Sequence, residues 1–469
     1  MNSYHENKKH DDLNNVISED VLKILNERVC TLYHFRDHYF ENHDLNDSIN
    51  RNRDIEVELQ ETLALFTKYK DCIENSVRAK YYYLRGRALN VVPRYSKEAE
   101  DLLSKAIKLD PKLVEAWNEL GECYWKNDNL KEATNCFNKA LLYEKNKISL
   151  RNLSMLARQN SASNQEERQK NIETGLNYAK DAVQLDPHDG LSWAILANAH
   201  LSSFFGVTQN PKTLKQCLSA YTQAEKDIVA KTTPDLHYNK GITLKYEEEF
   251  KLALESFNNA SLYDPVWEPP KIKKKQLLKY LNDINELVST SGKMKAKKLT
   301  QLLQSIDSKQ LGPYSGGSYT SSSGQTVKLE ETCINDLKAG INEEKVVLGK
   351  VVCSVHCEDA VPFTFCLVDR LGTCVAVTVY NFAEGKGVII GDSVAIPEPY
   401  ITDVNFEYSD KVRIGKLLLI MFLCLIKLKG EYKFRLIRVE TPLVLVVNSK
   451  KLTRDKQAGV QMSIFKKFD

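Results

Sequence analysis

The feature that most constrains the fold is the spacing of apolar residues between Val114 and Ala140. These residues follow at intervals of three and four on both sides of a polar break, as Trp117, Leu120, Gly121, Tyr124, then Ala133, Phe137 and Ala140. Such intervals place side chains on one face of a helix, so the stretch predicts a helix, a turn and a second helix. The glycine and alanines fit where two helices approach closely, and the aromatic rings fill the remaining space.

The pattern returns along the chain. The same phase recurs around Gly241 and Phe257, around Gly86 and Leu103, and, with a longer insertion, after Trp193. The repeat resembles the tetratricopeptide repeat, a helical hairpin of about 34 residues. A single hairpin cannot bury its own apolar face, so neighbouring hairpins stack into a solenoid with a concave groove.

The chain divides into six segments. We expect a disordered tail at 1–17, two capping helices within 18–75 and the repeat solenoid at 76–288. A basic segment and a Gly/Ser-rich linker occupy 289–330, because flexible linkers have this composition. A β domain follows at 331–450, and a second disordered tail at 451–469 completes the chain.

The β domain is predicted because the spacing of apolar residues changes from intervals of three and four to an interval of two. Beyond the linker, apolar and polar residues alternate in about five short segments, and Asp369–Gly372 forms a hairpin turn between two of them. Short strands of this number favour a small barrel of the OB-fold type. The expected fold class is therefore α + β, an α-solenoid of repeats followed by an OB-fold-like β-barrel.

One segment fits this pattern poorly. Leu417–Ile426 is a run of ten apolar residues between two lysines. A bilayer span needs about twenty, so no membrane partner is expected. One interpretation is a fully buried core strand.

The composition excludes several classes of chemistry. The net charge is only +3, and none of the eleven cysteines forms a CxxC pair, so neither a general electrostatic partner nor a zinc site is indicated. The sequence has no HExxH, GxSxG or GxxxxGK[ST] motif. We expect a binding protein that is not an enzyme and has no cofactor and no metal, in a reducing compartment.

Two charged residues are candidates for the groove. Asp235 is the second residue of a repeat's first helix, a position that faces the groove, and could receive a cation. Alternatively it only complements the helix dipole, with Thr233 as N-cap and Pro234 first. Arg158 replaces a packing aromatic at the end of a short helix, where it reaches the groove or pairs with a neighbouring acid.

Two basic clusters lie near the end of the solenoid, Lys271–Gln276 and Gly292–Lys298. Each is either a solvated helix face or a contact with nucleic-acid phosphates, which would be independent of base sequence and sensitive to salt.

Several stretches resemble one family closely, the Strap family of tetratricopeptide repeat proteins. They include YHFRDHYFENH, NLSMLARQ, PDLHYNKG and IRVETPLVLVVN, and the resemblance covers about Leu32 to Asn448. It implies a repeat domain followed by an OB-fold, and a reader of the Met-Arg-Glu start of nascent tubulin at the ribosome. Reading this start triggers decay of tubulin messenger RNA through an mRNA-decay adaptor.

The resemblance assigns roles to particular residues. It implies that Arg158 holds the peptide glutamate, that Asp235 holds the peptide arginine, and that Lys295 and Lys297 contact ribosomal RNA. The family's second acid lies in a Trp-Pro-Glu-Pro sequence. This chain has Trp-Glu-Pro-Pro, with the acid one position earlier, so Glu268 is the candidate.

The resemblance leaves two matters open. About twenty residues around Leu417–Ile426 have no counterpart in the family, and they are either a gene-model artefact or a lineage-specific strand. The family is also credited with nuclear scaffolding, in which the repeats hold an acetyltransferase complex and the OB-fold touches DNA. DNA binding would need exposed aromatic and basic strands, and those here are mostly apolar. We therefore favour the nascent-chain adaptor, with cytoplasmic and nuclear localisation.

Overall fold

The computed structural model describes residues 2–73, 75–316, 318–320, 324, 326–359, 361–409 and 429–458. The apolar run Leu417–Ile426 therefore lies outside the described residues. The chain forms two compact units. The first contains Met1–Leu244 and Ser256–Pro270, and the second contains Lys245–Glu255 and Lys271–Gln461.

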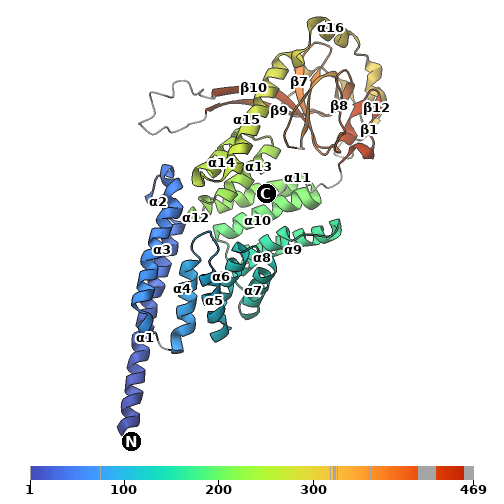
Figure 1. Ribbon diagram of the computed structural model, residues 1–469. Helices are drawn as coiled ribbons and strands as arrows, with labels where there is room; N and C mark the ends of the chain where they lie inside the picture. Colours follow the sequence, from blue (N-terminus) through green and yellow to red (C-terminus); the bar gives the residue numbers. More distant parts are fainter. Residues whose placement is uncertain are drawn as a thin grey trace, which may run out of the picture. The chain divides into compact units, whose positions relative to one another are not determined.

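The first unit is built from helices (Figure 1). Those before the repeats are α1 (Asn2–Asp37), α2 (Tyr39–Asn42) and α3 (Arg51–Lys68), with the short turns η1 (Leu45–Asn50), η2 (Lys70–Cys72) and η3 (Asn75–Val77). Helix α1 begins inside the segment for which the sequence predicts a disordered tail.

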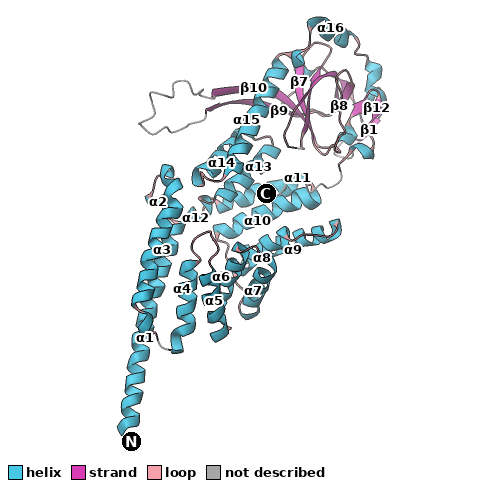
Figure 2. Cartoon of the chain, viewed as in Figure 1, coloured by secondary structure: helices cyan, strands magenta, loops and turns pink. Residues whose placement is uncertain are grey.

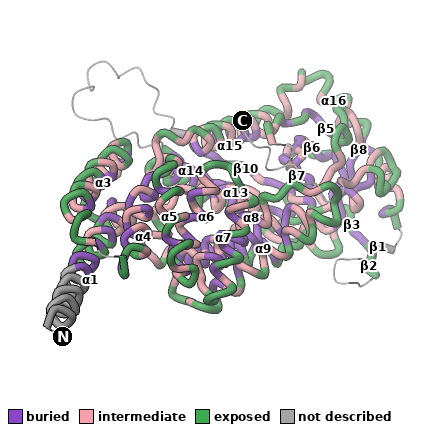
Figure 3. The backbone as a smooth tube through the Cα atoms, turned by 60° about the horizontal axis from the view of Figure 1, so that its bottom comes forward, coloured by how far each residue is buried: buried purple, intermediate pink, exposed green. Residues whose placement is uncertain are grey.

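The repeat helices follow in pairs. They are α4 (Arg78–Leu89), α5 (Lys97–Leu109), α6 (Val114–Lys126), α7 (Leu130–Tyr143), α8 (Lys147–Gln159), α9 (Gln165–Leu185), α10 (Gly190–Ser203), η4 (Phe204–Thr208), α11 (Pro211–Ala224), α12 (Ile228–Lys231), α13 (Pro234–Tyr246) and α14 (Phe250–Tyr263). Buried residues recur along each of α4 to α9 (Figure 3). The prediction of stacked helical hairpins is confirmed.

Close approach explains the glycines of the repeat. A Cβ atom added to Gly121 would lie 2.7 Å from the ring of Phe137, and one added to Gly241 would lie 2.7 Å from the ring of Phe257. Both rings are fully buried. Glycine in the first helix therefore lets the phenylalanine of the second helix reach the hairpin core, as the spacing predicts.

The starts of several repeat helices are fixed by polar side chains. The residue before the helix accepts a hydrogen bond from a backbone N–H of the first turn at Ser96, Asn129, Asn146, Asn164, Asp189 and Asn210. Such caps contribute about 1 kcal/mol each. They define where each hairpin begins and so which residues fall on its first turn.

The second unit continues from helix α15 (Glu268–Ser289) and α16 (Ala296–Gln304) into a β domain (Figure 2). Its strands are β1 (Ser318–Thr320), β2 (Thr326–Lys328), β3 (Glu330–Glu331), β4 (Gly340–Ile341), β5 (Lys345–Val355), β6 (Phe363–Val368), β7 (Cys374–Val379), β8 (Ser393–Pro397), β9 (Tyr400–Ser409), β10 (Lys429–Val439), β11 (Val446–Val447) and β12 (Lys450–Lys451). Short helical turns are η5 (Ser291–Lys293), η6 (Ser308–Tyr314), η7 (Ile334–Asp336), η8 (Pro442–Val444) and η9 (Arg454–Lys456).

The main sheet runs in the order β12-β11-β8-β5-β6-β7-β10-β9-β4, with β3 paired to β5. The β6–β7 hairpin turns at Asp369–Gly372 as predicted, and Gly372 adopts a positive φ of 81° there. The sheet is not closed, so the β domain differs in this respect from the expected barrel. Its core is mostly aliphatic, with Val347, Val377, Ile396 and Ile437, and also contains the ring of Phe365.

A buried acid ties the α13–α14 turn into the second unit. The carboxylate of Glu248 accepts hydrogen bonds from Thr378 (2.8 Å) and from the Tyr380 hydroxyl (3.1 Å), and Arg438 lies 3.7 Å away. Burial raises the pKa of Glu248, and the Arg438 charge opposes that rise. Because every polar contact of this acid serves the fold, we assign it no binding role.

Candidate functional site

Arg158 is a largely buried cation near the end of α8. Its Nε donates to the carbonyl of Ser154 at 3.0 Å, and its Nη1 donates to the hydroxyl of Ser202 on α10 at 3.3 Å. Burial lowers the pKa of Arg158 to about 10, and the neighbouring Tyr221 acts in the opposite direction. Among the described residues, no carboxylate forms an ion pair with this guanidinium.

Arg151, on the same helix, differs from Arg158 because it has an acidic partner. Nη1 of Arg151 lies 2.8 Å from a carboxylate oxygen of Asp189, and Lys147 lies 3.2 Å from the other oxygen. One arginine of α8 is thus paired with an acid of the chain. The other has hydrogen bonds only to neutral groups, so a carboxylate ligand would supply a contact that the fold does not.

Tyr221 connects Arg158 with Asp235. Its hydroxyl, on α11, donates to Oδ1 of Asn198 at 2.6 Å, and the side chain of Asn239 on α13 donates to the same oxygen at 3.2 Å. Burial raises the pKa of Tyr221; the Arg158 charge acts against the rise and the Asp235 charge adds to it. Both charges therefore act electrostatically on one phenol. We call these side chains, with Ser202, the Tyr221 cluster.

Asp235 lies in the first turn of α13, after Pro234, where the sequence places it. The side chain reaches solvent, but the surrounding protein replaces part of its water. This desolvation raises the pKa of Asp235, and the negative charge of Asp264 adds to the rise. The hydroxyl of Thr233, expected as the N-cap, donates to the carbonyl of Val229 at 3.2 Å.

Glu268 is exposed and is the first residue of α15. The turn before it packs on α13, because the Tyr263 ring stacks on His237 with centroids 5.3 Å apart and Trp267 lies 4.9 Å from Tyr238. The sequence prediction missed Asp264, which lies within this turn and acts electrostatically on Asp235.

The two basic clusters differ in whether their lysines form ion pairs with acids of the chain. In the first, Lys273 forms an ion pair with Asp359 at 2.5 Å, and Asp359 also binds Lys245. In the second, Lys295 immediately precedes α16 and Lys297 lies in its first turn, and both are exposed. Neither forms an ion pair with any residue that the structure describes.

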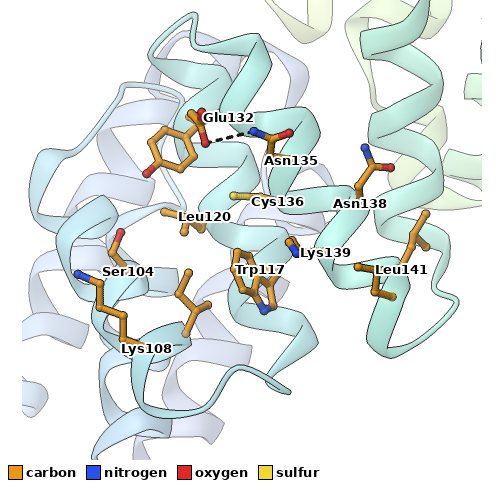
Figure 4. Close-up of a pocket in the computed structure, with 13 residues that line it drawn as sticks. Ser104, Lys108, Trp117, Leu120, Glu132, Asn135, Cys136, Asn138, Lys139 and Leu141 are labelled. Atoms are coloured by element: carbon orange, nitrogen blue, oxygen red, sulfur yellow. Dashed lines mark hydrogen bonds between the residues drawn. The ribbon is translucent and has the colours of Figure 1, made fainter.

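A pocket of about 890 Å³ lies elsewhere in the first unit, among α5, α6 and α7 (Figure 4). Trp117, Lys108 and Lys139 are among the residues that line it, and the Trp117 indole donates to the carbonyl of Pro111 at 2.8 Å. None of the predicted site residues lines this pocket. Its existence follows from helix stacking, which the spacing of residues along one hairpin does not define.

Comparisons with known proteins agree with the two-part architecture. Residues 97–154 match a family model for the tetratricopeptide repeat, and residues 328–461 match the model described as the tetratricopeptide repeat protein 5 OB fold domain. Tetratricopeptide repeat protein 5 of Homo sapiens is 45% identical over 93% of this chain and 95% of its own length. The Bos taurus protein of the same name is 44% identical over 95% of this chain and 97% of its own. The chain belongs to the tetratricopeptide repeat protein 5 family.

Membership of the tetratricopeptide repeat protein 5 family indicates an adaptor or scaffold. Neither matching family model describes a catalytic domain. Within the described part of the chain, no helix combines the length and apolar character needed to cross a bilayer. The same residues contain no group of three or more His, Cys, Asp or Glu side chains arranged to hold a metal ion.

Proposed function

We propose that this protein is a non-enzymatic adaptor whose repeats bind the Met-Arg-Glu N-terminus of nascent tubulin at the ribosome. The observation that carries the proposal is the Tyr221 cluster. A guanidinium without an acidic partner among the described residues and an exposed carboxylate with a raised pKa both act electrostatically on the same phenol. This pair of opposite charges fits a peptide that carries one cation and one anion.

The order of charges in the peptide fits their placement on different helices. Successive side chains of an extended peptide point to opposite sides. An arginine directed to Asp235 on α13 would leave the next residue, glutamate, directed to Arg158 on α8. Glu268, at the start of α15, is the acid that the family resemblance adds to the arginine side. Each charge-assisted hydrogen bond contributes about 1.5–3 kcal/mol.

The ribosome contact is assigned to Lys295 and Lys297. These lysines are exposed and lie before and within the first turn of α16. Lysine binds phosphate as a point charge, and rRNA presents phosphates near the point where a nascent chain emerges. Binding of the tubulin start at the ribosome would then recruit an mRNA-decay adaptor in the cytoplasm.

A double-mutant cycle tests the peptide site. Peptides beginning Met-Arg-Glu, Met-Arg-Gln and Met-Glu-Arg are titrated by fluorescence anisotropy against the native protein, Arg158→Ala and Asp235→Ala. We expect each variant to weaken binding of Met-Arg-Glu about tenfold or more, and the Met-Arg-Gln peptide to be insensitive to Arg158→Ala. The Met-Glu-Arg peptide, of the same composition, should bind weakly throughout.

Glu115→Gln is the matched control. Glu115 lies in the first turn of α6, the position equivalent to that of Asp235 in α13, and is exposed. Its replacement should leave affinity unchanged. Equal affinities of the native protein for Met-Arg-Glu and Met-Glu-Arg would contradict the proposal.

A further inference from the structure

Three cysteine side chains meet on one face of the β domain, on the neighbouring strands β5, β6 and β7. Cys353 of β5 lies directly opposite Cys366 of β6 in the antiparallel ladder. Cys366 lies opposite Ala376 of β7, and Cys374 stands two positions before Ala376, on the same face. The Cys366 thiol is in hydrogen-bond contact with the sulfurs of both other cysteines. No three His, Cys, Asp or Glu side chains in the described part of the chain are arranged to hold a metal ion, so this cluster points to thiol chemistry.

Within the cluster, Cys353 and Cys366 have the geometry of a disulfide pair. The register of β5 and β6 shifts between Val351 and Cys353 and is regular from Cys353 to Val355. Residues directly opposite each other in such a ladder have Cα atoms about 4.5–5.5 Å apart, within the range of about 4.4–6.8 Å that a disulfide spans. The diagonal neighbours Cys366 and Cys374 are about 7–8 Å apart, beyond that range. Cys374 therefore cannot form a disulfide with Cys366 unless the strands move.

The two thiols of this pair differ in exposure and in acidity. Cys353 is 8% exposed, whereas Cys366 is fully buried. Hydrogen bonds from the thiol and the backbone N–H of Cys366 lower the pKa of Cys353, and burial opposes this effect. The same contact raises the pKa of Cys366. Because the thiolate is the reactive form of cysteine, Cys353 is the residue that meets a soluble oxidant, and Cys366 is placed to react with the oxidised sulfur.

The turn η5 covers the Cys353 thiol. A Cβ atom added to Gly292 would lie 3.1 Å from Sγ of Cys353, so the backbone of the turn packs on this sulfur. The φ angles of Ser291, Gly292 and Lys293 are 46°, 70° and 56°. The left-handed conformation is unfavourable for serine and lysine and persists only where neighbouring contacts hold it. The packing of η5 on Cys353 is one of the contacts that maintain the turn.

We infer that Cys353 and Cys366 are a dithiol that reacts with hydrogen peroxide, and that the resulting disulfide releases the η5 turn. In the first step the Cys353 thiolate attacks one peroxide oxygen, the O–O bond breaks, and the leaving hydroxide takes up the proton that the thiol released. In the second step Cys366 loses its proton, and its sulfur attacks the sulfenic sulfur of Cys353 and displaces hydroxide, which becomes a second water. The two thiols thus lose two electrons and two protons, and one hydrogen peroxide becomes two waters.

The disulfide changes the support of the turn. Its formation draws Sγ of Cys353 to about 2.05 Å from Sγ of Cys366, toward β6 and off the backbone of Gly292. The left-handed residues on either side of Gly292 then lose a contact that holds them, and the start of α16 moves with the turn. Lys295 and Lys297 follow the turn directly. Oxidation would therefore weaken the ribosome contact, a consequence that rests on the proposed function.

Mapping of the disulfide in the native full-length protein tests the first part of the inference. The protein is treated with hydrogen peroxide, its remaining thiols are alkylated, and it is digested without reduction by trypsin and by a protease that cuts after glutamate. The cut after Glu358 separates Cys353 from Cys366, which otherwise share one tryptic peptide. Mass spectrometry should find the two peptides joined, lighter by two hydrogens, in most of the protein, and dithiothreitol should separate them. No link, or a link that fragmentation assigns to Cys357, would overturn the inference.

Serine variants identify the pair. Cys353→Ser and Cys366→Ser should each abolish the link. Cys374→Ser is the matched control, because it removes a thiol of the same cluster that lies on the diagonal, and it should leave the link intact. Loss of the link in Cys374→Ser as well would contradict the assignment of the pair. If a serine variant fails to fold, as judged by circular dichroism, the mapping in the native protein still decides.

Hydrogen exchange and cosedimentation test the effect on the turn. Amide exchange in residues 291–297 should become about tenfold faster or more on oxidation of the native protein and stay unchanged in Cys353→Ser treated in the same way. Equal exchange in the oxidised and reduced native protein would refute the release of η5.

After removal of peroxide, the oxidised protein should cosediment about tenfold less with ribosomes translating tubulin, and dithiothreitol should restore cosedimentation. If the reduced protein does not cosediment, the proposed function fails, whereas the disulfide and the exchange result stand. If both forms cosediment equally, η5 does not control the ribosome contact.

Discussion

Arg158 offers a prediction in which stability and binding change in opposite directions. Burial lowers the pKa of Arg158 to about 10. One pKa unit corresponds to about 1.4 kcal/mol, so burying this charge costs about 3 kcal/mol. Its hydrogen bonds to Ser154 and Ser202 return about 1 kcal/mol each. Methionine has a similar length, fills the same space and carries no charge.

We therefore expect Arg158→Met to raise the free energy of unfolding by about 1 kcal/mol. The same variant should bind Met-Arg-Glu peptides about tenfold or more weakly, since the peptide glutamate loses its partner. Urea denaturation followed by circular dichroism measures the first quantity, and fluorescence anisotropy measures the second.

Arg151→Met is the matched control, on the same helix. Arg151 is paired with Asp189 at 2.8 Å, and both side chains are largely buried. Its removal should lower the free energy of unfolding by about 1–3 kcal/mol, because Asp189 loses one of two cations. If Arg158→Met is destabilised as much as Arg151→Met, then Arg158 is a structural residue and the reasoning is refuted.

Three further predictions concern other parts of the molecule. Peptide affinity should fall as the pH is lowered through the raised pKa of Asp235, since only the ionised carboxylate attracts the peptide cation; anisotropy titrations should show a shallower profile for Asp235→Asn, in which only the peptide glutamate still loses its charge. Replacing Lys295 and Lys297 with Glu should abolish cosedimentation with ribosomes translating tubulin and leave free-peptide binding intact. The same change of both β12 lysines is the control and should leave both cosedimentation and peptide binding unchanged. Native association should also weaken steeply between low and moderate salt. Gly121→Ala would place a Cβ atom 2.7 Å from the Phe137 ring and should lower the free energy of unfolding by about 1–3 kcal/mol, measured by urea denaturation; an unchanged midpoint would mean that the hairpin opens freely.

The fold was predictable where its cause is local. The pairing of Gly121 with Phe137 depends on intervals within one hairpin, and the β6–β7 turn depends on adjacent residues, so both can be read from the sequence. The open order of the strands could not be read from the sequence, because it depends on pairings between segments that are far apart in the chain, such as β10 with β7. The ion pair of Lys273 with Asp359 spans 86 residues and was likewise invisible.

The site was predictable only in part, for a related reason. Arg158 and Asp235 stand out because each breaks a local rule or occupies a special position. Tyr221 and Asn198 do not, since an aromatic or polar residue at helical spacing looks like ordinary packing. Asp264 lies before a proline and looks like a turn residue. Only the stacking of α8, α10, α11 and α13 shows which of these residues share one neighbourhood.

In both units, some charged residues form ion pairs within the chain and serve the fold, whereas others form none within its described part and are candidates for binding. Arg151 and Lys273 bind acids of the chain itself. Arg158, Lys295 and Lys297 form no ion pair with any described residue. For the exposed lysines this costs little, because water solvates them and surface ion pairs contribute at most about 1 kcal/mol. For Arg158 the unpaired charge is largely buried and therefore expensive. A chain selected for stability alone would place an apolar residue there, so the argument for a ligand is strongest at Arg158. An Arg158→Met protein that is more stable but no longer binds the peptide would establish that Arg158 serves binding.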